Sequence, residues 1–310
     1  MNMPCLDFVA RGRCSRRWPT GRVSLTAACL LLLFAASSKA TWGQEASETL
    51  QYPLSVAAVD DRTLYVADRL LPGVWKVTDG APAVFARGEK RFRTPLNAIR
   101  AVAVAADGSV FVGDSATREI YRLAEDGTPT PLTGGKIGIP VDLAITSTGQ
   151  LFVSDLETQR IWKLPVAGGD PEEFAQLAAP RGLFVDTRDQ LWAIAASGDA
   201  PLVRVAADGS VDPVVTERAF EFPHDVVVDD DGVAYVSDNY AACIWQVSTA
   251  GDVTKLVSGA PLQGPVGLAR SSAGVLVADP RAKAIYLLDQ AGTLTAITSA
   301  QRAASTDAKE

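Results

Sequence analysis

A short motif repeats six times along this 310-residue chain and constrains the fold more than any other feature. An aromatic residue is followed by Val, any residue and Asp, as in Tyr65-Val66-Ala67-Asp68. Further copies end at positions 114, 155, 195, 238 and 279, where the copy at 195 has lost its Asp and the copy at 279 its aromatic residue. Self-similarity at a period of 40 to 46 residues is typical of propellers, solenoids and other repeat architectures.

Two β-rich segments flank each copy, so the repeat contains more than one strand. The upstream segments are 53–59, 99–104, 140–145, 180–185, 223–228 and 265–269, and the downstream ones are 74–77, 120–123, 161–164, 202–205, 244–247 and 285–288. Alternation of apolar and polar residues within them is the signal of half-buried strands. Tight-turn dipeptides such as Asp107-Gly108 and Asp126-Gly127 separate neighbouring segments, because they tolerate the positive φ that hairpins need.

Each repeat therefore predicts a four-stranded antiparallel meander, and six meanders too small to bury their own faces pack around an axis. We predict an all-β, six-bladed β-propeller with four antiparallel strands per blade, over residues 53–300. The Trp and Tyr residues of the third strands are expected to fill the seams between blades. We expect the last blade to supply its own fourth strand, 294–298, which leaves 49–52 as the candidate for a closing strap.

The N-terminal 40 residues have the pattern of a secretory signal peptide. Five arginines precede an apolar run, 23–37, that ends at the small-residue site Ser38-Lys39-Ala40. An uncleaved membrane anchor is the alternative interpretation. Cleavage predicts a secreted or periplasmic protein with an N-terminal linker at 41–52, and the polar stretch 301–310 is expected to be a disordered tail.

Cleavage also changes the charge and the cysteine content. The net charge of the whole chain is −7. Removal of 1–40 lowers the basic residues from 29 to 23 and the acidic ones from 36 to 35, which gives −12. An acidic surface argues against nucleic acid and, after cleavage, against membrane as a partner. Only Cys243 of the four cysteines remains, which excludes an intramolecular disulfide.

The Asp of the motif is expected to be structural, because a residue that recurs in every unit does the same job each time. We predict that it accepts backbone N–H bonds in the loop after the second strand. The fourth copy has Ala195 instead, so Ser197 or Asp199 is expected to replace it.

Function is expected where the repeats differ along one rim. The start of each first strand should lie beside the end of the second strand. Counting back from the turn at 230 and 231 gives three facing pairs: Asp225 with Asp238, His224 with Asn239, and Asp142 with Asp155. The other blades carry Ser55, Ala101, Gly182 and Gly267 at the position of Asp142 and Asp225.

Two facing carboxylates are destabilising unless something compensates. Either a cation lies between them, with calcium as the natural hard ion for Asp142 and Asp225, or Arg100 and Arg181 reach across the channel. The alternative is that each Asp bonds only to local backbone. The rim candidates for ligand binding are Arg100, Arg181, His224, Asp225, Asn239 and Tyr240. His224 could be a general base, a metal ligand or a tolerated polar residue, and no catalytic residue is identified.

The repeat, with its opening Pro, Asp-Gly turn, aromatic-Val-x-Asp and Ile-aromatic-basic segments, resembles the NHL-repeat family of six-bladed propellers over about residues 50 to 300. It resembles the gluconolactonase-like propellers more distantly. The metal ligands that this second resemblance implies fall on Gln51, on Val141 or Arg181, and on His224, so most anionic ligands are missing. A zinc lyase site needs several His, and His224 is the single His of the chain.

Such propellers include binding platforms, sensor ectodomains, hydrolases and lyases, so the resemblance implies a fold rather than one function. We favour a secreted, non-catalytic propeller that binds a protein, peptide, glycan or small ligand on the channel rim. A metal-dependent hydrolase or lyase of the gluconolactonase-like type with a degenerate metal site is the second hypothesis. A membrane-tethered sensor is the third.

Overall fold

The structure, a computed structural model, describes residues 49–298. The predicted signal peptide at 1–40, the first part of the predicted linker at 41–52 and the predicted tail at 301–310 lie outside the described residues. Within 49–298, no helix is long and apolar enough to span a membrane.

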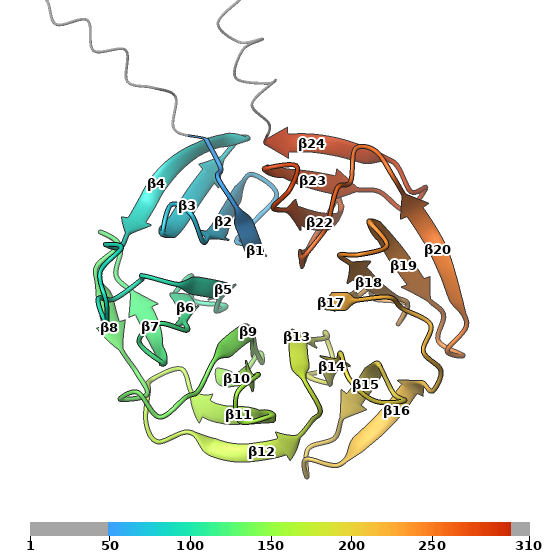
Figure 1. Cartoon of the computed structure of the whole chain (residues 1–310), viewed down its shortest axis with the longest axis horizontal. Coiled ribbons are helices and arrows are strands. Elements are labelled where there is room, and N and C mark those ends of the chain that lie inside the picture. Colours follow the sequence, from blue (N-terminus) through green and yellow to red (C-terminus); the bar gives the residue numbers. More distant parts are fainter. Residues whose placement is uncertain (1–48, 299–310) are drawn as a thin grey trace, which may run out of the picture. The chain divides into compact units, whose positions relative to one another are not determined.

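Six sheets of four strands follow one another around a central channel (Figure 1). Blade 1 contains β1 (Pro53–Ala58), β2 (Thr63–Asp68), β3 (Gly73–Thr78) and β4 (Ala81–Arg87). Blade 2 contains β5 (Ile99–Val104), β6 (Val110–Asp114), β7 (Glu119–Leu123) and β8 (Pro129–Pro131). Blade 3 contains β9 (Pro140–Ile145), β10 (Gln150–Asp155), β11 (Arg160–Pro165) and β12 (Glu172–Gln176).

The second half of the ring repeats this pattern. Blade 4 contains β13 (Pro180–Val185), β14 (Leu191–Ala195), β15 (Leu202–Val205) and β16 (Val211–Val215). Blade 5 contains β17 (Pro223–Val228), β18 (Ala234–Asp238), β19 (Cys243–Val247) and β20 (Val253–Ser258). Blade 6 contains β21 (Gly267–Ser271), β22 (Gly274–Asp279), β23 (Ala284–Leu288) and β24 (Leu294–Thr298). All neighbouring strands within a blade are antiparallel, which confirms the predicted six-bladed β-propeller.

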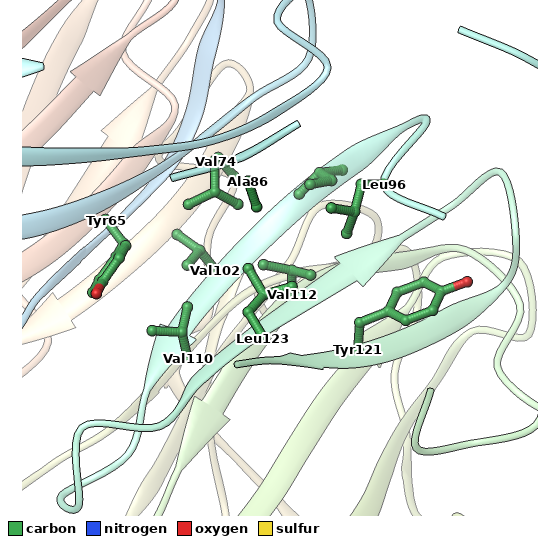
Figure 2. Close-up of a cluster of buried hydrophobic side chains, with 11 residues drawn as sticks. Tyr65, Val74, Ala86, Leu96, Val102, Val110, Val112, Tyr121 and Leu123 are labelled. Atoms are coloured by element: carbon green, nitrogen blue, oxygen red, sulfur yellow. The ribbon is translucent and has the colours of Figure 1, made fainter. Parts of the chain in front are cut away.

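The hydrophobic core lies in the seams between blades. In the seam between blades 1 and 2, Tyr65 and Val74 pack with Val102, Val112 and Tyr121 (Figure 2). The third-strand aromatic residues are part of these seams as predicted, since Trp75 is 1% exposed in the seam between blades 6 and 1. Because apolar burial is the main favourable term in folding, each blade depends on its two neighbours.

The motif Asp residues are structural, as predicted. Asp68, Asp114, Asp155, Asp238 and Asp279 are fully buried. Asp155 accepts hydrogen bonds from the backbone N–H of Gly138 and Ile139 before the first strand, at 2.8 and 2.9 Å, and from those of Glu157 and Thr158 after the second, at 3.0 and 3.2 Å. Each such carboxylate therefore joins the segment that enters the blade to the loop that follows its second strand.

Three of these carboxylates also anchor the third strand through an indole N–H, which the sequence analysis did not predict. Trp75, Trp162 and Trp245 donate to Asp68, Asp155 and Asp238 at 3.0, 2.9 and 3.2 Å. The same Trp therefore fills a seam and fixes its own blade.

Blade 4 lacks this anchor because Ala195 stands at its position. The expectation that Ser197 or Asp199 replaces it was wrong: within residues 49–298 the structure gives neither side chain such a bond. Blade 4 keeps only the backbone bond that other blades make beside their carboxylate: Ala196 N–H donates to the carbonyl of Ala179 at 3.0 Å, as Asn239 N–H donates to that of Phe222 at 3.2 Å in blade 5.

Among residues 49–298, the ring closes between blades 6 and 1 without exchange of a strand. β24 pairs with β23 in the sheet of blade 6, as predicted for 294–298. The two blades meet through side chains, where Leu50, ahead of β1, packs with Leu276 and Ile285. On their exposed turns, Ser272 donates from its N–H and Oγ to Asp61 at 3.2 and 2.5 Å.

Candidate functional site

A β-bulge shifts the inner strands by one residue from the predicted register. In blade 5, Asp225 faces Ser237 and Pro223 faces Asp238, so His224 is the extra residue. In blade 3, Asp142 faces Ser154. The three predicted pairs, Asp225 with Asp238, His224 with Asn239, and Asp142 with Asp155, were therefore wrong, because counting from the turn assumed an unbroken ladder.

The bulges place the variable rim residues outside the regular pairing. The extra residues are Leu54 in blade 1, Arg100 in blade 2, Val141 in blade 3 and His224 in blade 5, and in blade 4 the irregularity covers Arg181 and Gly182. A bulge redirects the side chain of its extra residue and is frequent beside functional sites. Arg100, Arg181 and His224 thus differ from their neighbours in both chemistry and geometry.

In blades 1, 3 and 5, the residue that follows the bulge accepts a hydrogen bond from a backbone N–H of the next blade. Val102 N–H donates to Ser55 Oγ at 3.2 Å, Leu183 N–H to Asp142 Oδ2 at 2.7 Å, and Leu268 N–H to Asp225 Oδ2 at 2.7 Å. Blades 1, 3 and 5 therefore supply the acceptors and blades 2, 4 and 6 the donors. Asp225 also accepts from the adjacent Val226 N–H at 2.7 Å, so the carboxylates bond to backbone both within and between blades, and the expectation of local bonds alone was wrong.

The donor blades carry small residues at the equivalent positions. These are Ala101, Gly182 and Gly267. A Cβ atom on Gly182 would overlap Asp225, and one on Gly267 would lie 2.6 Å from the carbonyl oxygen of Leu54. The absence of a side chain lets the inner strands approach closely enough for these bonds.

Asp142 and Asp225 lie close together, since Asp142 accepts from Leu183 N–H at 2.7 Å and a Cβ atom on the adjacent Gly182 would overlap Asp225 Oδ1. Burial raises the pKa of Asp142 to about 7. Burial, and then the charge of Asp142, raise the pKa of Asp225 well above its ordinary value. Two carboxyl groups in contact cannot both ionise easily, so the pair retains a shared proton near neutral pH.

Arginines surround the channel mouth above this pair. Arg100 Nε donates to Ser115 Oγ at 3.2 Å. Burial lowers the pKa of Arg100, and the charge of Arg69 adds to this effect. Burial also lowers the pKa of Arg181, with Arg100 as the next cause. These guanidinium groups are therefore near enough to repel one another.

His224 lies among the same charges and is partly buried. Burial, and then the charges of Arg181 and Arg100, lower its pKa to about 3. The imidazole is neutral at physiological pH, and it is a weak base for proton abstraction there.

An aromatic stack borders Arg181. Its guanidinium lies 4.3 Å from the ring centre of Phe222, which stacks on Tyr240 at 4.5 Å and 15°. Tyr240 is 64% exposed. Asn239 is already engaged, because its Nδ2 donates to the carbonyl of Gly264 at 3.0 Å and its Oδ1 accepts from Arg281 at 3.4 Å.

The structure brings together Arg100, Arg181 and His224, with Tyr240 next to Arg181, and buries Asp142 and Asp225 beneath them. The sequence analysis missed Arg69 and Phe222. Arg69 directly follows the first motif Asp, and Phe222 directly precedes the Pro of β17. Both positions belong to the rim, so a full survey of rim positions could have found them.

These residues fit a calcium ion poorly. Calcium takes six to eight oxygen ligands, whereas Asp142 and Asp225 already accept backbone N–H bonds and lie beneath mutually repelling arginines. Among residues 49–298, no group of three or more His, Cys, Asp or Glu could hold a metal ion. Calcium binding by Asp142 and Asp225 stays a prediction.

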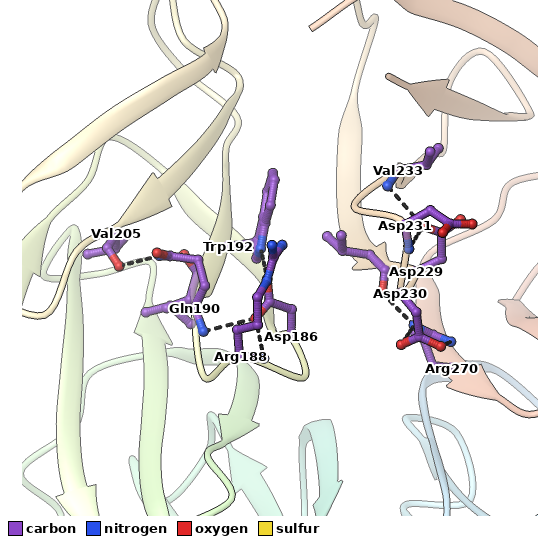
Figure 3. Close-up of polar contacts among 12 residues, drawn as sticks. Asp186, Arg188, Gln190, Trp192, Val205, Asp229, Asp230, Asp231, Val233 and Arg270 are labelled. Carbon is purple, nitrogen blue, oxygen red and sulfur yellow. Dashed lines mark hydrogen bonds and ion pairs between the residues drawn. The ribbon is translucent and has the colours of Figure 1, made fainter. Parts of the chain in front are cut away.

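Two cavities contain fewer groups suited to binding or catalysis than the rim does. The first, of about 200 Å³, lies in the channel and is lined by inner-strand residues such as Asp142 and Leu183. A cavity of about 460 Å³ lies at the turns of blades 5 and 6, on the opposite face. Its Arg270 is paired with Asp230 at 3.0 Å (Figure 3), and its Tyr235 donates to Asp229 at 3.2 Å. The polar groups of this larger cavity are therefore satisfied internally.

Comparison with known proteins agrees with this architecture. The NHL repeat family matches residues 220–247, which span most of the inner three strands of blade 5. No curated protein matches the chain by sequence.

Solved structures of similar fold differ in function. Virginiamycin B lyase from Staphylococcus aureus is 14% identical with a TM-score of 0.62, covering 81% of this chain and 85% of that one. A gluconolactonase from Xanthomonas campestris is 17% identical at 0.62, covering 76% and 85%. A nidogen/laminin complex chain is 17% identical at 0.63, covering 73% and 89%. Enzymes and a protein complex thus share this fold. The chain is a six-bladed β-propeller that contains an NHL repeat.

Proposed function

We propose that this propeller is a non-catalytic binding platform that holds its ligand at the rim of the channel. One observation carries the proposal: the bulged positions of the inner strands place Arg100, Arg181 and the neutral His224 at one mouth, where no carboxylate of residues 49–298 forms an ion pair with either arginine. Tyr240 adds an exposed aromatic surface beside them. These groups are suited to recognition, and His224 is a weak base near neutral pH because its pKa is lowered to about 3.

The N-terminal pattern supports export to the periplasm or the extracellular space. The partners that we consider are therefore a protein, a peptide, a glycan or a small ligand outside the cytoplasm. The net charge of the chain, −7, disfavours nucleic acid as a partner.

A metal-dependent hydrolase or lyase is the second candidate. The observation in its favour is the buried pair of Asp142 and Asp225, because perturbed carboxyl groups concentrate at catalytic sites. Their engagement in bonds between blades favours a structural role. The likeness to lyase and lactonase structures, below 20% identity, carries only the fold.

The test compares binding by the exported protein with binding by three variants on peptide and glycan arrays. Tyr240→Ser and Arg181→Gln change the rim, and Arg122→Gln changes an exposed residue of the third strand of blade 2 as the control. We expect a set of array members that the wild type and Arg122→Gln retain and that the rim variants lose. An unchanged set in the rim variants, or no retained member for the wild type, refutes the rim as a binding surface.

A further inference from the structure

We propose that the rim ligand carries an oxyanion group, a carboxylate or a phosphate, and that Arg100 and Arg181 bind this group across the channel mouth. This inference rests on the proposed rim function and names the chemistry of its ligand.

The first step is the position of the two arginines. Arg100 is the bulge residue of β5, and Arg181 lies in the irregular stretch of β13. These strands line the channel in blades 2 and 4, with Val141 as the small apolar bulge residue of the blade between them (Figure 1). The two guanidinium groups therefore approach from either side of blade 3, and Arg69 of blade 1 adds a third positive charge near Arg100.

The second step is that the protein does not neutralise these charges. Some exposed cations are paired with carboxylates, as in Arg62 with Asp79 and Arg270 with Asp230. Across residues 49–298, neither Arg100 nor Arg181 forms an ion pair, although acidic residues outnumber basic ones by 36 to 29 in the chain. The nearby Asp142 and Asp225 are occupied with each other and with backbone N–H groups. In an acidic protein, the two arginines at this mouth thus have no ion pair with any carboxylate of residues 49–298.

The third step is an unused donor. Among residues 49–298, the Nε of Arg181 is buried and has no hydrogen-bond partner. A buried donor left unpaired is unfavourable, so a ligand oxygen that accepts from it gains affinity. Phe222 covers one face of the guanidinium, which leaves its edge for in-plane acceptors.

An oxyanion is the ligand chemistry that meets these conditions. Guanidinium groups bind carboxylate and phosphate through two parallel hydrogen bonds, and these charge-assisted bonds are among the strongest in proteins. One anion between Arg100 and Arg181 would also cancel their mutual repulsion. The neutral His224 beside them adds an N–H donor without adding charge. The exposed ring of Tyr240 can stack on a planar group attached to the anion.

The experiment measures binding of inorganic phosphate, phenyl phosphate and benzoate to the whole exported protein by isothermal titration calorimetry at constant ionic strength. Benzyl alcohol is the neutral control. We expect saturable one-to-one binding of at least one of the anions and none of benzyl alcohol. Benzoate and phosphate distinguish a carboxylate site from a phosphate site.

Arg100→Gln and Arg181→Gln are each expected to weaken that binding about tenfold or more, since one charge-assisted hydrogen bond accounts for such a factor. The control Arg122→Gln keeps the wild-type affinity. If a Gln variant loses its cooperative thermal transition, Arg100→Lys or Arg181→Lys replaces it, and the loss of the planar fork still weakens binding. Wild-type protein that binds none of the three anions, or arginine variants that bind as tightly as the wild type, overturns the inference.

The two proposals fail in different ways. Array binding that depends on Tyr240, together with no anion binding, overturns the oxyanion and leaves the rim function standing. If neither array binding nor anion binding changes in Tyr240→Ser and Arg181→Gln, both proposals are overturned.

Discussion

Replacement of Asp142 by Asn is expected to reduce the pH dependence of stability above pH 4, while the part that the buried Asp225 contributes remains. The folded chain keeps the proton of this buried carboxyl up to a pKa of about 7, whereas the ordinary value is 3.8. Between these values the unfolded chain releases the proton and the folded chain does not. The stability of the wild type therefore falls as the pH rises from about 4 to about 7 and levels off above.

The size of this effect follows from the difference between the two pKa values. It is roughly three pH units, and each unit corresponds to about 1.36 kcal/mol, so the loss is on the order of 4 kcal/mol. In Asp142→Asn the side-chain carbonyl can still accept from Leu183 N–H, and the amide can donate to Asp225. We expect the variant to match the wild type near pH 4.5 and to be more stable near pH 7.5.

The assay is urea unfolding at several pH values between 4.5 and 7.5, with the free energy of unfolding taken from midpoints at constant slope. Carboxylates with lowered pKa values, such as Asp155, finish titrating below this window. Asp126→Asn, at an exposed turn where backbone bonding to Thr128 lowers the pKa, is the control and should follow the wild type. Parallel profiles for the wild type and Asp142→Asn would show that this carboxyl ionises normally in the folded protein and would refute the reasoning.

Three further perturbations test other features. Asp238→Ala should destabilise the protein by roughly 3 kcal/mol or more in thermal or urea unfolding, because several buried donors lose their acceptor at about 1–3 kcal/mol each; a loss below 1 kcal/mol contradicts the anchoring role. Gly182→Ala, at a position without a positive φ, should cost about 1–3 kcal/mol through overpacking against Asp225, and an unchanged free energy of unfolding contradicts the close approach of these strands. Chelation should leave the thermal midpoint unchanged, and a fall that added calcium reverses would instead support a metal between Asp142 and Asp225.

The blades were predictable because every repeat must meet the same physical requirements. A meander must bury both faces and hold its loops, so the seam aromatic residues and the motif Asp recur at fixed spacing. The register of the inner strands was not predictable in this way. The extra residue of the bulge differs from blade to blade, as Leu54 and His224 illustrate. No shared residue type therefore marks the position of the bulge in the sequence.

The candidate site was predictable only in part. Arg100, Arg181 and His224 could be named because they depart from the residues at equivalent positions. Their mutual approach and the contact between Asp142 and Asp225 depend on how the ring brings different blades together, which spacing along one chain does not report. The unpartnered Nε of Arg181 is likewise a property of packing.

The closure of the ring has a mechanical consequence. Within residues 49–298, β1 and β24 belong to different sheets, and the seam between blades 6 and 1 consists of side-chain packing around Leu50 and the contacts of Ser272 with Asp61. Tension applied between residues 49 and 298 loads this seam without the support of a strand that bridges it. We expect the ring to open at this seam at low force, while each of the six four-stranded sheets stays folded.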